Sequence, residues 1–170
     1  MHRRSAIRFV FASAVLCAVG ALLAPAADAQ QAFQRFLPFL IDLKGWTGEK
    51  PDGMAVEVPG TSMITATREY RRGDAQLSAQ IVTGPAAQGA TAATQTNVNI
   101  ETGDAHMRTA TIDGLPVASS YTVKDRSGII LVALSANAMF SMSFKGVAED
   151  EALSIAKQFD WKGIQASVPK

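Results

Sequence analysis

Apolar residues are distributed in two different ways along this chain. Residues 9–24 form an apolar block without a charged residue. From residue 33 onward, apolar and polar residues alternate with a helix or strand period. The block therefore needs an explanation of its own, and the periodic remainder predicts a folded domain.

The first predicted element of the periodic part is a short helix. Its apolar residues recur three and four positions apart; they are Phe33, Phe36, Leu37, Leu40 and Ile41. Pro38 lies inside this run and has no backbone N–H to donate, so we expect the helix to bend or restart there and to end by Gly45. Glycines and prolines then predict a loop over residues 45–62, with a short extended piece at residues 54–58.

Two predicted strands follow and form a hairpin. Residues 64–72 are rich in threonine, and the turn is supplied by Gly73 and Asp74. Residues 75–81 alternate apolar and polar positions, which is the pattern of a half-buried strand. Residues 84–97 are mainly Ala, Thr, Gln and Gly. This composition fits either a weak helix or a loop. Threonine and glycine disfavour a helix, but we predict a helix here.

Four more strands are predicted at regular spacing, over residues 106–112, 116–124, 129–135 and 139–144. The dipeptide Asp113–Gly114 joins the first two and is a strong hairpin signal. The third is apolar at nearly every position, which predicts a central strand covered on both faces. In the fourth, Phe140, Met142 and Phe144 share one face.

The C-terminal helix is the clearest predicted element. Acidic residues 149–151 fit its first turn, where the helix dipole favours negative charge. Lys157 and Gly163 predict its end. Its apolar face comprises Ala148, Ala152, Ile155, Ala156 and Phe159. Together the elements predict an α+β fold in which an N-terminal and a C-terminal helix cover an antiparallel sheet of about six strands.

The apolar block has the features of a secretory signal. Arg3, Arg4 and Arg8 precede it, and Ala27, Asp28 and Ala29 form an A-x-A cleavage pattern. We therefore expect residues 1–29 to be a cleavable signal peptide and the protein to be periplasmic or secreted. The alternative is an uncleaved membrane anchor, although a spanning helix needs about 20 apolar residues.

Removal of the signal changes the charge balance. The whole chain has 16 basic and 15 acidic residues, of which 13 and 14 lie after residue 29. A nucleic-acid binder shows a basic excess, so this class is excluded. The single cysteine, Cys17, lies within the apolar block, and therefore no disulfide stabilises the rest. A chain of this length can bury one ordinary core, and we expect one domain over residues 30–170 without membrane insertion.

Candidate catalytic chemistry is sparse. His106 is the only histidine after residue 29, and with Asp104 it supplies at most two of the three or four ligands that zinc requires. A triad of Asp104, His106 and Ser119 or Ser120 can be written down, but no nucleophile-elbow motif accompanies these serines. We therefore expect no catalytic residue, no metal site and no cofactor.

Four aromatic residues are better candidates for a role in binding. Trp46 and Trp161 each follow an apolar helix and precede a glycine, and Phe36 and Phe39 belong to the apolar stripe of the first helix. Core packing explains them most simply. The other interpretation is an aromatic-lined groove between the helices and the sheet, or a contact with a membrane or a partner protein.

Three motifs carry a resemblance. They are D-L-x-G-W at residues 42–46, R-x-Y-x-x-G at residues 68–73 and I-D-G-L-P at residues 112–116. With the acidic C-terminal helix, their order resembles small uncharacterised exported proteins of proteobacteria. The strands between two helices are also similar to the Mog1/PsbP-like α/β/α sandwich. This resemblance implies a binding or accessory role and assigns no functional residue.

The sequence therefore leaves three function classes open. The first is a non-catalytic envelope protein that binds a protein partner. The second is a carrier of a small ligand in an apolar groove near Trp46 and Trp161. The third is an enzyme whose site the sequence does not reveal. Fold alone does not decide between them.

Overall fold

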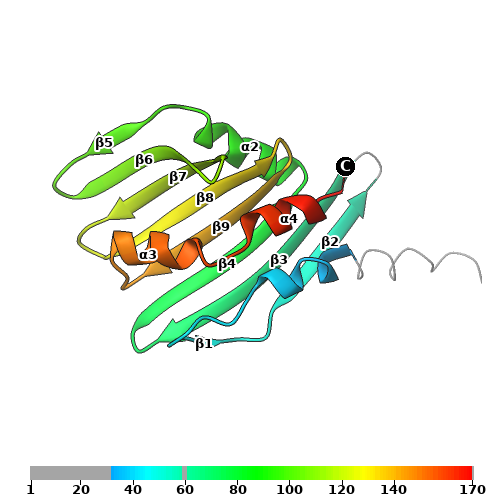
Figure 1. Ribbon diagram of the computed structural model, residues 1–170, viewed down its shortest axis with the longest axis horizontal. Coiled ribbons are helices and arrows are strands. Elements are labelled where there is room, and N and C mark those ends of the chain that lie inside the picture. Colours follow the sequence, from blue (N-terminus) through cyan, green and yellow to red (C-terminus); the bar gives the residue numbers. More distant parts are fainter. Residues whose placement is uncertain (1–31, 59–60, 170) are drawn as a thin grey trace, which may run out of the picture.

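Strand-forming sequence dominates the chain, and the strands pair into one antiparallel sheet (Figure 1). The computed structural model describes residues 32–58 and 61–169, so the predicted signal segment lies outside the described residues. The strands there are β1 (Thr47–Gly48), β2 (Asp52–Val58), β3 (Thr61–Arg72), β4 (Ala75–Thr83), β5 (Asn99–Glu101), β6 (Ala105–Ile112), β7 (Leu115–Thr122), β8 (Ser127–Ser135) and β9 (Ala138–Lys145). Their spatial order is β1-β3-β4-β9-β8-β7-β6-β5, and β2 also pairs with β3.

The expected number of about six strands is too low, because the sheet has nine. The prediction missed β1 and β5 and reduced β2 to a short extended piece. β1 and β5 have only two and three residues, and they form because long neighbouring strands offer them hydrogen-bond partners. β2 contains Gly53 and follows Pro51, which suggested a loop, but all seven of its residues pair with β3.

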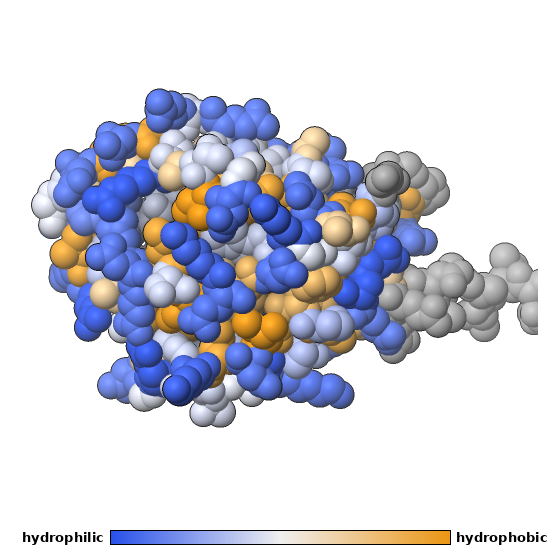
Figure 2. All heavy atoms as spheres, viewed as in Figure 1, coloured by the Kyte–Doolittle hydropathy of each residue, from blue (hydrophilic) through white to orange (hydrophobic). Residues whose placement is uncertain are grey.

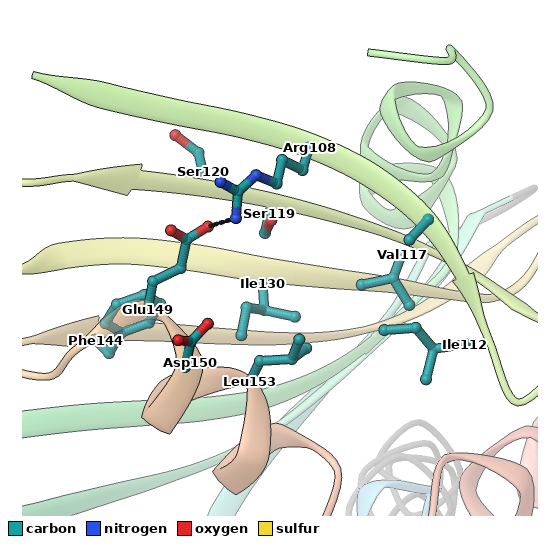
Figure 3. A pocket seen from close by; sticks show the side chains of 11 residues that line it. Arg108, Ile112, Val117, Ser119, Ser120, Ile130, Phe144, Glu149, Asp150 and Leu153 are labelled. Carbon is teal, nitrogen blue, oxygen red and sulfur yellow. Dashed lines mark hydrogen bonds and ion pairs between the residues drawn. The ribbon is translucent and has the colours of Figure 1, made fainter. Parts of the chain in front are cut away.

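The described helices are all short. They are the 3₁₀ helix η1 (Leu37–Phe39) and the α-helices α2 (Pro85–Thr94), α3 (Glu149–Ala156) and α4 (Trp161–Ser167). The N-terminal segment, α3 and α4 lie on one face of the sheet, whereas α2 lies on the other (Figures 1 and 3). At ten residues, α2 is the longest of them, and none has the length and hydrophobicity of a membrane span.

The helix predicted over residues 84–97 is confirmed as α2. Pro85 occupies its first turn, where the missing N–H costs nothing. The hydroxyls of Thr91 and Thr94 bond back to the carbonyl oxygens of Gln88 and Thr91 at 3.0 and 2.7 Å. These bonds satisfy the threonine hydroxyls inside the fold, so the helix tolerates residues that usually disfavour it.

The N-terminal helix is shorter than predicted. Residues 32–34 are helical, and Pro38 then lies in the first turn of η1 rather than inside a continuous helix. The chain leaves the helical conformation at Leu40. Although the helix is shorter than predicted, its apolar residues Phe36 and Leu40 are both buried, as expected for core packing.

The C-terminal helix is divided into α3 and α4, so the prediction that Gly163 ends it is wrong. Gly163 lies inside α4, where its N–H donates to the Asp160 carboxylate at 2.9 Å. Asp160 is the N-cap of a new helix, and this cap restarts the chain after Phe159. A Cβ at position 163 would lie 2.8 Å from the Phe39 ring, so glycine also allows η1 and α4 to pack closely.

The main core lies between the sheet and the helices α3 and α4, which cover one of its faces. The shared face of Phe140, Met142 and Phe144 is confirmed, and all three residues are buried. Register pairs Met142 with Ala79 of β4 and with Ile130 of β8, so the buried positions form continuous rows across the sheet. Ile155 and Phe159 close this core from the helical side.

Candidate binding cleft beside helix α3

A cleft opens where α3 stops covering the sheet. α3 has only eight residues, and its buried residues Ala152, Ile155 and Ala156 join the core above the central strands. Beyond the helix, β6 and β7 present residues of modest size toward the same face, including Ala110 and Ser119. Because neither side chain reaches the helix, a space of about 120 Å³ remains between them.

The lining of the cleft is mostly apolar, and its charged side chains gather on one side, which we call its mouth (Figure 3). The apolar lining comprises Ala110, Ile112, Val117, Ile130, Phe144 and Leu153. The polar side chains of the lining are Arg108, Ser119, Glu149 and Asp150. Ser120 also borders the cleft, but its side chain lies on the opposite face of β7. Apolar walls with a few converging polar groups are the usual composition of a small-molecule site. Figure 2, which views the α3 and α4 face, shows apolar residues reaching the surface between polar ones.

Glu149 ties α3 to β6, the strand next to the edge of the sheet. One carboxylate oxygen lies 2.6 Å from His106 Nδ1, and the other accepts from an Arg108 guanidinium nitrogen at 3.2 Å. A second guanidinium nitrogen of Arg108 lies 3.1 Å from Glu101 of β5. The His106 and Glu149 side chains are each only 20% exposed. We refer to Glu149, His106 and Arg108 as the clasp, since together they hold α3 against β6.

The clasp differs from the triad considered in the sequence. The carboxylate partner of His106 is Glu149 from α3, not Asp104 from its own strand. Register places Tyr121 opposite His106 and Ser119 opposite Arg108, so Ser119 is a diagonal neighbour of the histidine. No hydrogen bond joins Ser119 or Ser120 to His106 in the described part of the chain, nor does any group of three potential metal ligands occur among those residues.

The four aromatic residues proposed for binding lie away from this cleft. Phe36 and Trp161 are buried, and the Trp161 ring packs 6.3 Å from that of Phe140. Phe39 is half-buried against Gly163. Trp46 lies under the Arg72 guanidinium, which is 4.3 Å from the ring centroid and also binds Glu151 of α3 at 2.6 Å. The structure thus uses these rings for packing, and a ligand groove between Trp46 and Trp161 stays a prediction.

The segment that carries Trp46 is held by β3. Arg68 donates to the carbonyl oxygens of Leu40 and Glu49 at 2.7 and 2.8 Å and also pairs with Asp42. The Tyr70 hydroxyl donates to Ile41 O at 2.8 Å, and burial raises the pKa of Tyr70 to about 12. The first two motifs of the sequence therefore contact each other, and their role is to fasten the N-terminal segment to the sheet.

A second hollow lies near the end of α2 and is less suited to an apolar ligand. Its volume is about 330 Å³, and its lining is dominated by threonine, glutamine and asparagine side chains at residues 94–97 and 109–111. Thr109 in this lining already exchanges hydrogen bonds with the backbone of Val98. The cleft beside α3 is therefore the stronger candidate site.

Comparison with known proteins adds no functional assignment. No family model, curated protein or solved structure matches the chain. The resemblance to exported proteins and to the Mog1/PsbP-like fold consequently stays a prediction.

Sequence reasoning missed the cleft because its residues come from five separate elements. The one available signal was the alternation in β6 and β7, which places Arg108 and Ser119 on a face that should otherwise be apolar. Polar residues on the inner face of strands near the edge of a sheet indicate that the covering helix does not reach them. The position of α3 was needed to turn that signal into a site.

Proposed function

We propose that this protein is a non-catalytic binding protein and that its ligand is a small, mostly apolar molecule held in the cleft beside α3. The observation that carries the proposal is an apolar cavity of about 120 Å³ with charged and hydroxyl groups at its mouth. An apolar cavity of about 150 Å³ in another protein binds benzene. The cleft therefore suits a molecule with an apolar body of about six carbon atoms.

The clasp supports a binding role over a catalytic one. Both carboxylate oxygens of Glu149 have partners, and His106 uses Nδ1 to hold α3. A histidine that fastens a helix to a strand keeps the cleft in shape, which favours binding through a pre-formed site. We propose that the protein acts in the periplasm or outside the cell, in line with the export signal expected at residues 1–29.

Filling the cleft tests this function. We expect hexan-1-ol to shift the backbone NMR signals of Ala110, Ser119 and Leu153 in a saturable way. Ala110→Leu places an added side chain in the cleft and should abolish those shifts. Ala118→Leu is the matched control, because Ala118 lies on the opposite face of β7 and should leave binding intact. Shifts that stay unsaturated, or that survive Ala110→Leu, would show that the cleft is not the site.

A protein partner in the cell envelope is the second candidate function. The sheet face opposite α3 carries an apolar row, in which Ile100, Met107 and Ile129 are 51, 47 and 37% exposed. Register aligns Ile100 with Met107, and Ser120 links Met107 to Ile129, so the row crosses four strands. Exposed apolar patches of this kind mark contact surfaces when they are large enough.

Affinity capture from the envelope of the native host tests the second candidate. A partner that uses this row should be lost with Met107→Ser and kept with Met54→Ser, a matched change of a similarly exposed methionine on β2. Capture that is insensitive to Met107→Ser would exclude the row as the interface.

A further inference from the structure

We propose that the cleft selects small amphipathic amines, with the apolar body inside the cavity and the protonated amine on Asp150. This inference rests on the proposed function and adds the charge class of the ligand. It follows from how the charges at the mouth of the cleft are paired.

Arg108 and Glu149 are already committed to the clasp. Arg108 pairs with Glu149 at 3.2 Å and with Glu101 at 3.1 Å, and Glu149 also holds His106. The guanidinium charge is therefore balanced by two carboxylates before any ligand arrives. An anionic ligand would have to displace one of these carboxylates to reach the arginine.

Asp150 is the charge at the mouth that remains without a partner among the described residues. It is exposed, and it lies three residues before Leu153 on α3, so the two side chains emerge on the same side of the helix. Both line the cleft, and Figure 3 shows the Asp150 carboxylate near Leu153 and Ile130. An ammonium group on a six-carbon chain can thus meet the carboxylate while the chain contacts the apolar wall.

The N-terminus of α3 does not reverse this preference. A helix N-terminus attracts anions, but Glu149, Asp150 and Glu151 already occupy its first turn. The charges that line the cleft are one arginine against Glu149 and Asp150, which leaves an excess of negative charge. A carboxylic acid of the same length would therefore be repelled, and an alcohol would bind without an ion pair.

Three probes of equal chain length test the inference: hexan-1-amine, hexan-1-ol and hexanoate. NMR titration at neutral pH and low salt should rank their affinities as amine, alcohol, acid. An exposed ion pair contributes about 0.2–1 kcal/mol, so we expect the amine to bind about 1.4- to fivefold more tightly than the alcohol. In about 1 M salt this preference should disappear, because salt screens exposed charges.

Three variants test whether the preference for the amine depends on the charge of Asp150 or on the overall charge of the protein. Asp150→Asn should lose the preference for the amine and keep binding of the alcohol, whereas Asp150→Glu should retain the preference. Glu57→Gln removes an exposed charge from β2, at the far side of the sheet from the cleft, and should change nothing. Equal affinities for amine and alcohol in the wild type would overturn the inference alone. Failure of all three probes to bind would overturn the proposed function as well.

Discussion

At the residue scale, single contacts decide which side chains the fold accepts. Gly128 of β8 is paired with Tyr121 on one side and with Phe144 on the other. The two rings stack with centroids 6.1 Å apart over the space that a side chain would take. A Cβ there would lie 2.1 Å from Ser120 O and 2.8 Å from the Phe144 ring. Glycine is therefore required by close approach, at the second position of β8.

We predict that Gly128→Ala destabilises the protein, because neighbouring backbone must move to admit the methyl group. Overpacking of this kind costs about 1–3 kcal/mol. Gly103→Ala is the control, since nothing lies within 4 Å of the corresponding position, and it should change stability by less than about 0.5 kcal/mol. Urea unfolding measures both, and similar midpoints for the two variants would contradict the prediction.

The burial of Tyr70 leads to a second prediction, which concerns how the free energy of unfolding depends on pH. Burial raises the pKa of Tyr70 to about 12 in the folded protein, above its ordinary value of 10.0. The folded state therefore keeps a proton that the unfolded state releases. The free energy of unfolding consequently falls as pH rises from 10 to 12, by about 1.4 kcal/mol per pH unit from this group.

Tyr70→Phe isolates this contribution. Below pH 10 the variant lacks the hydrogen bond to Ile41 O and should be less stable by about 1 kcal/mol. Above pH 10 the gap between wild type and variant should narrow and then reverse, because only the wild type loses stability through Tyr70. Chemical unfolding at several alkaline pH values gives the comparison. A gap that stays constant would mean that Tyr70 titrates normally.

At the element scale, packing against the sheet decides where the helices begin and end. The break between α3 and α4 places Phe159 against the core, with its ring centroid 4.9 Å from that of Phe140 and 6.4 Å from that of Tyr70. Lys157, two residues before Phe159, is exposed and occupies the C-cap position of α3. α2 covers the opposite face only near Val82 and Ala133, which are buried, and it leaves Ile129 exposed. β8 is the central strand that its apolar sequence predicts, and the exposure of Ile129 shows that one of its faces is covered only in part.

Phe159 should be among the most costly side chains to truncate. It is 2% exposed, and a buried phenylalanine replaced by alanine typically costs about 3–5 kcal/mol. A domain holds only about 5–15 kcal/mol in total, so Phe159→Ala should remove a large share of the stability. Lys157→Ala should remove almost none. Urea unfolding of the two variants at one pH decides this, and equal midpoints would mean that the contact of Phe159 with the sheet carries little energy.

At the scale of the whole molecule, the expected signal segment and the folded domain are separate parts of the chain, and the boundary between them can be tested. Ala32, the third residue after the expected cleavage site, is buried in the core of the domain. We predict that the exported product begins at Gln30. Intact mass and N-terminal sequencing of the exported protein test this. A product that keeps Met1 and remains in the membrane fraction would show that the segment is an anchor.

Local sequence patterns were enough to predict the strands whose own residues alternate, the β3–β4 and β6–β7 hairpins, and the buried face of Phe140, Met142 and Phe144. These features depend on neighbours in the chain, and side-chain periodicity therefore reports them directly. The tertiary structure decided the rest: β1 and β5 exist through pairing, Asp160 divides the C-terminal helix, and Trp46 lies under Arg72. The cleft belongs to this second group. It forms because α3 lies beside the small residues on β6 and β7 and does not cover them, and no local pattern encodes where one element packs across another.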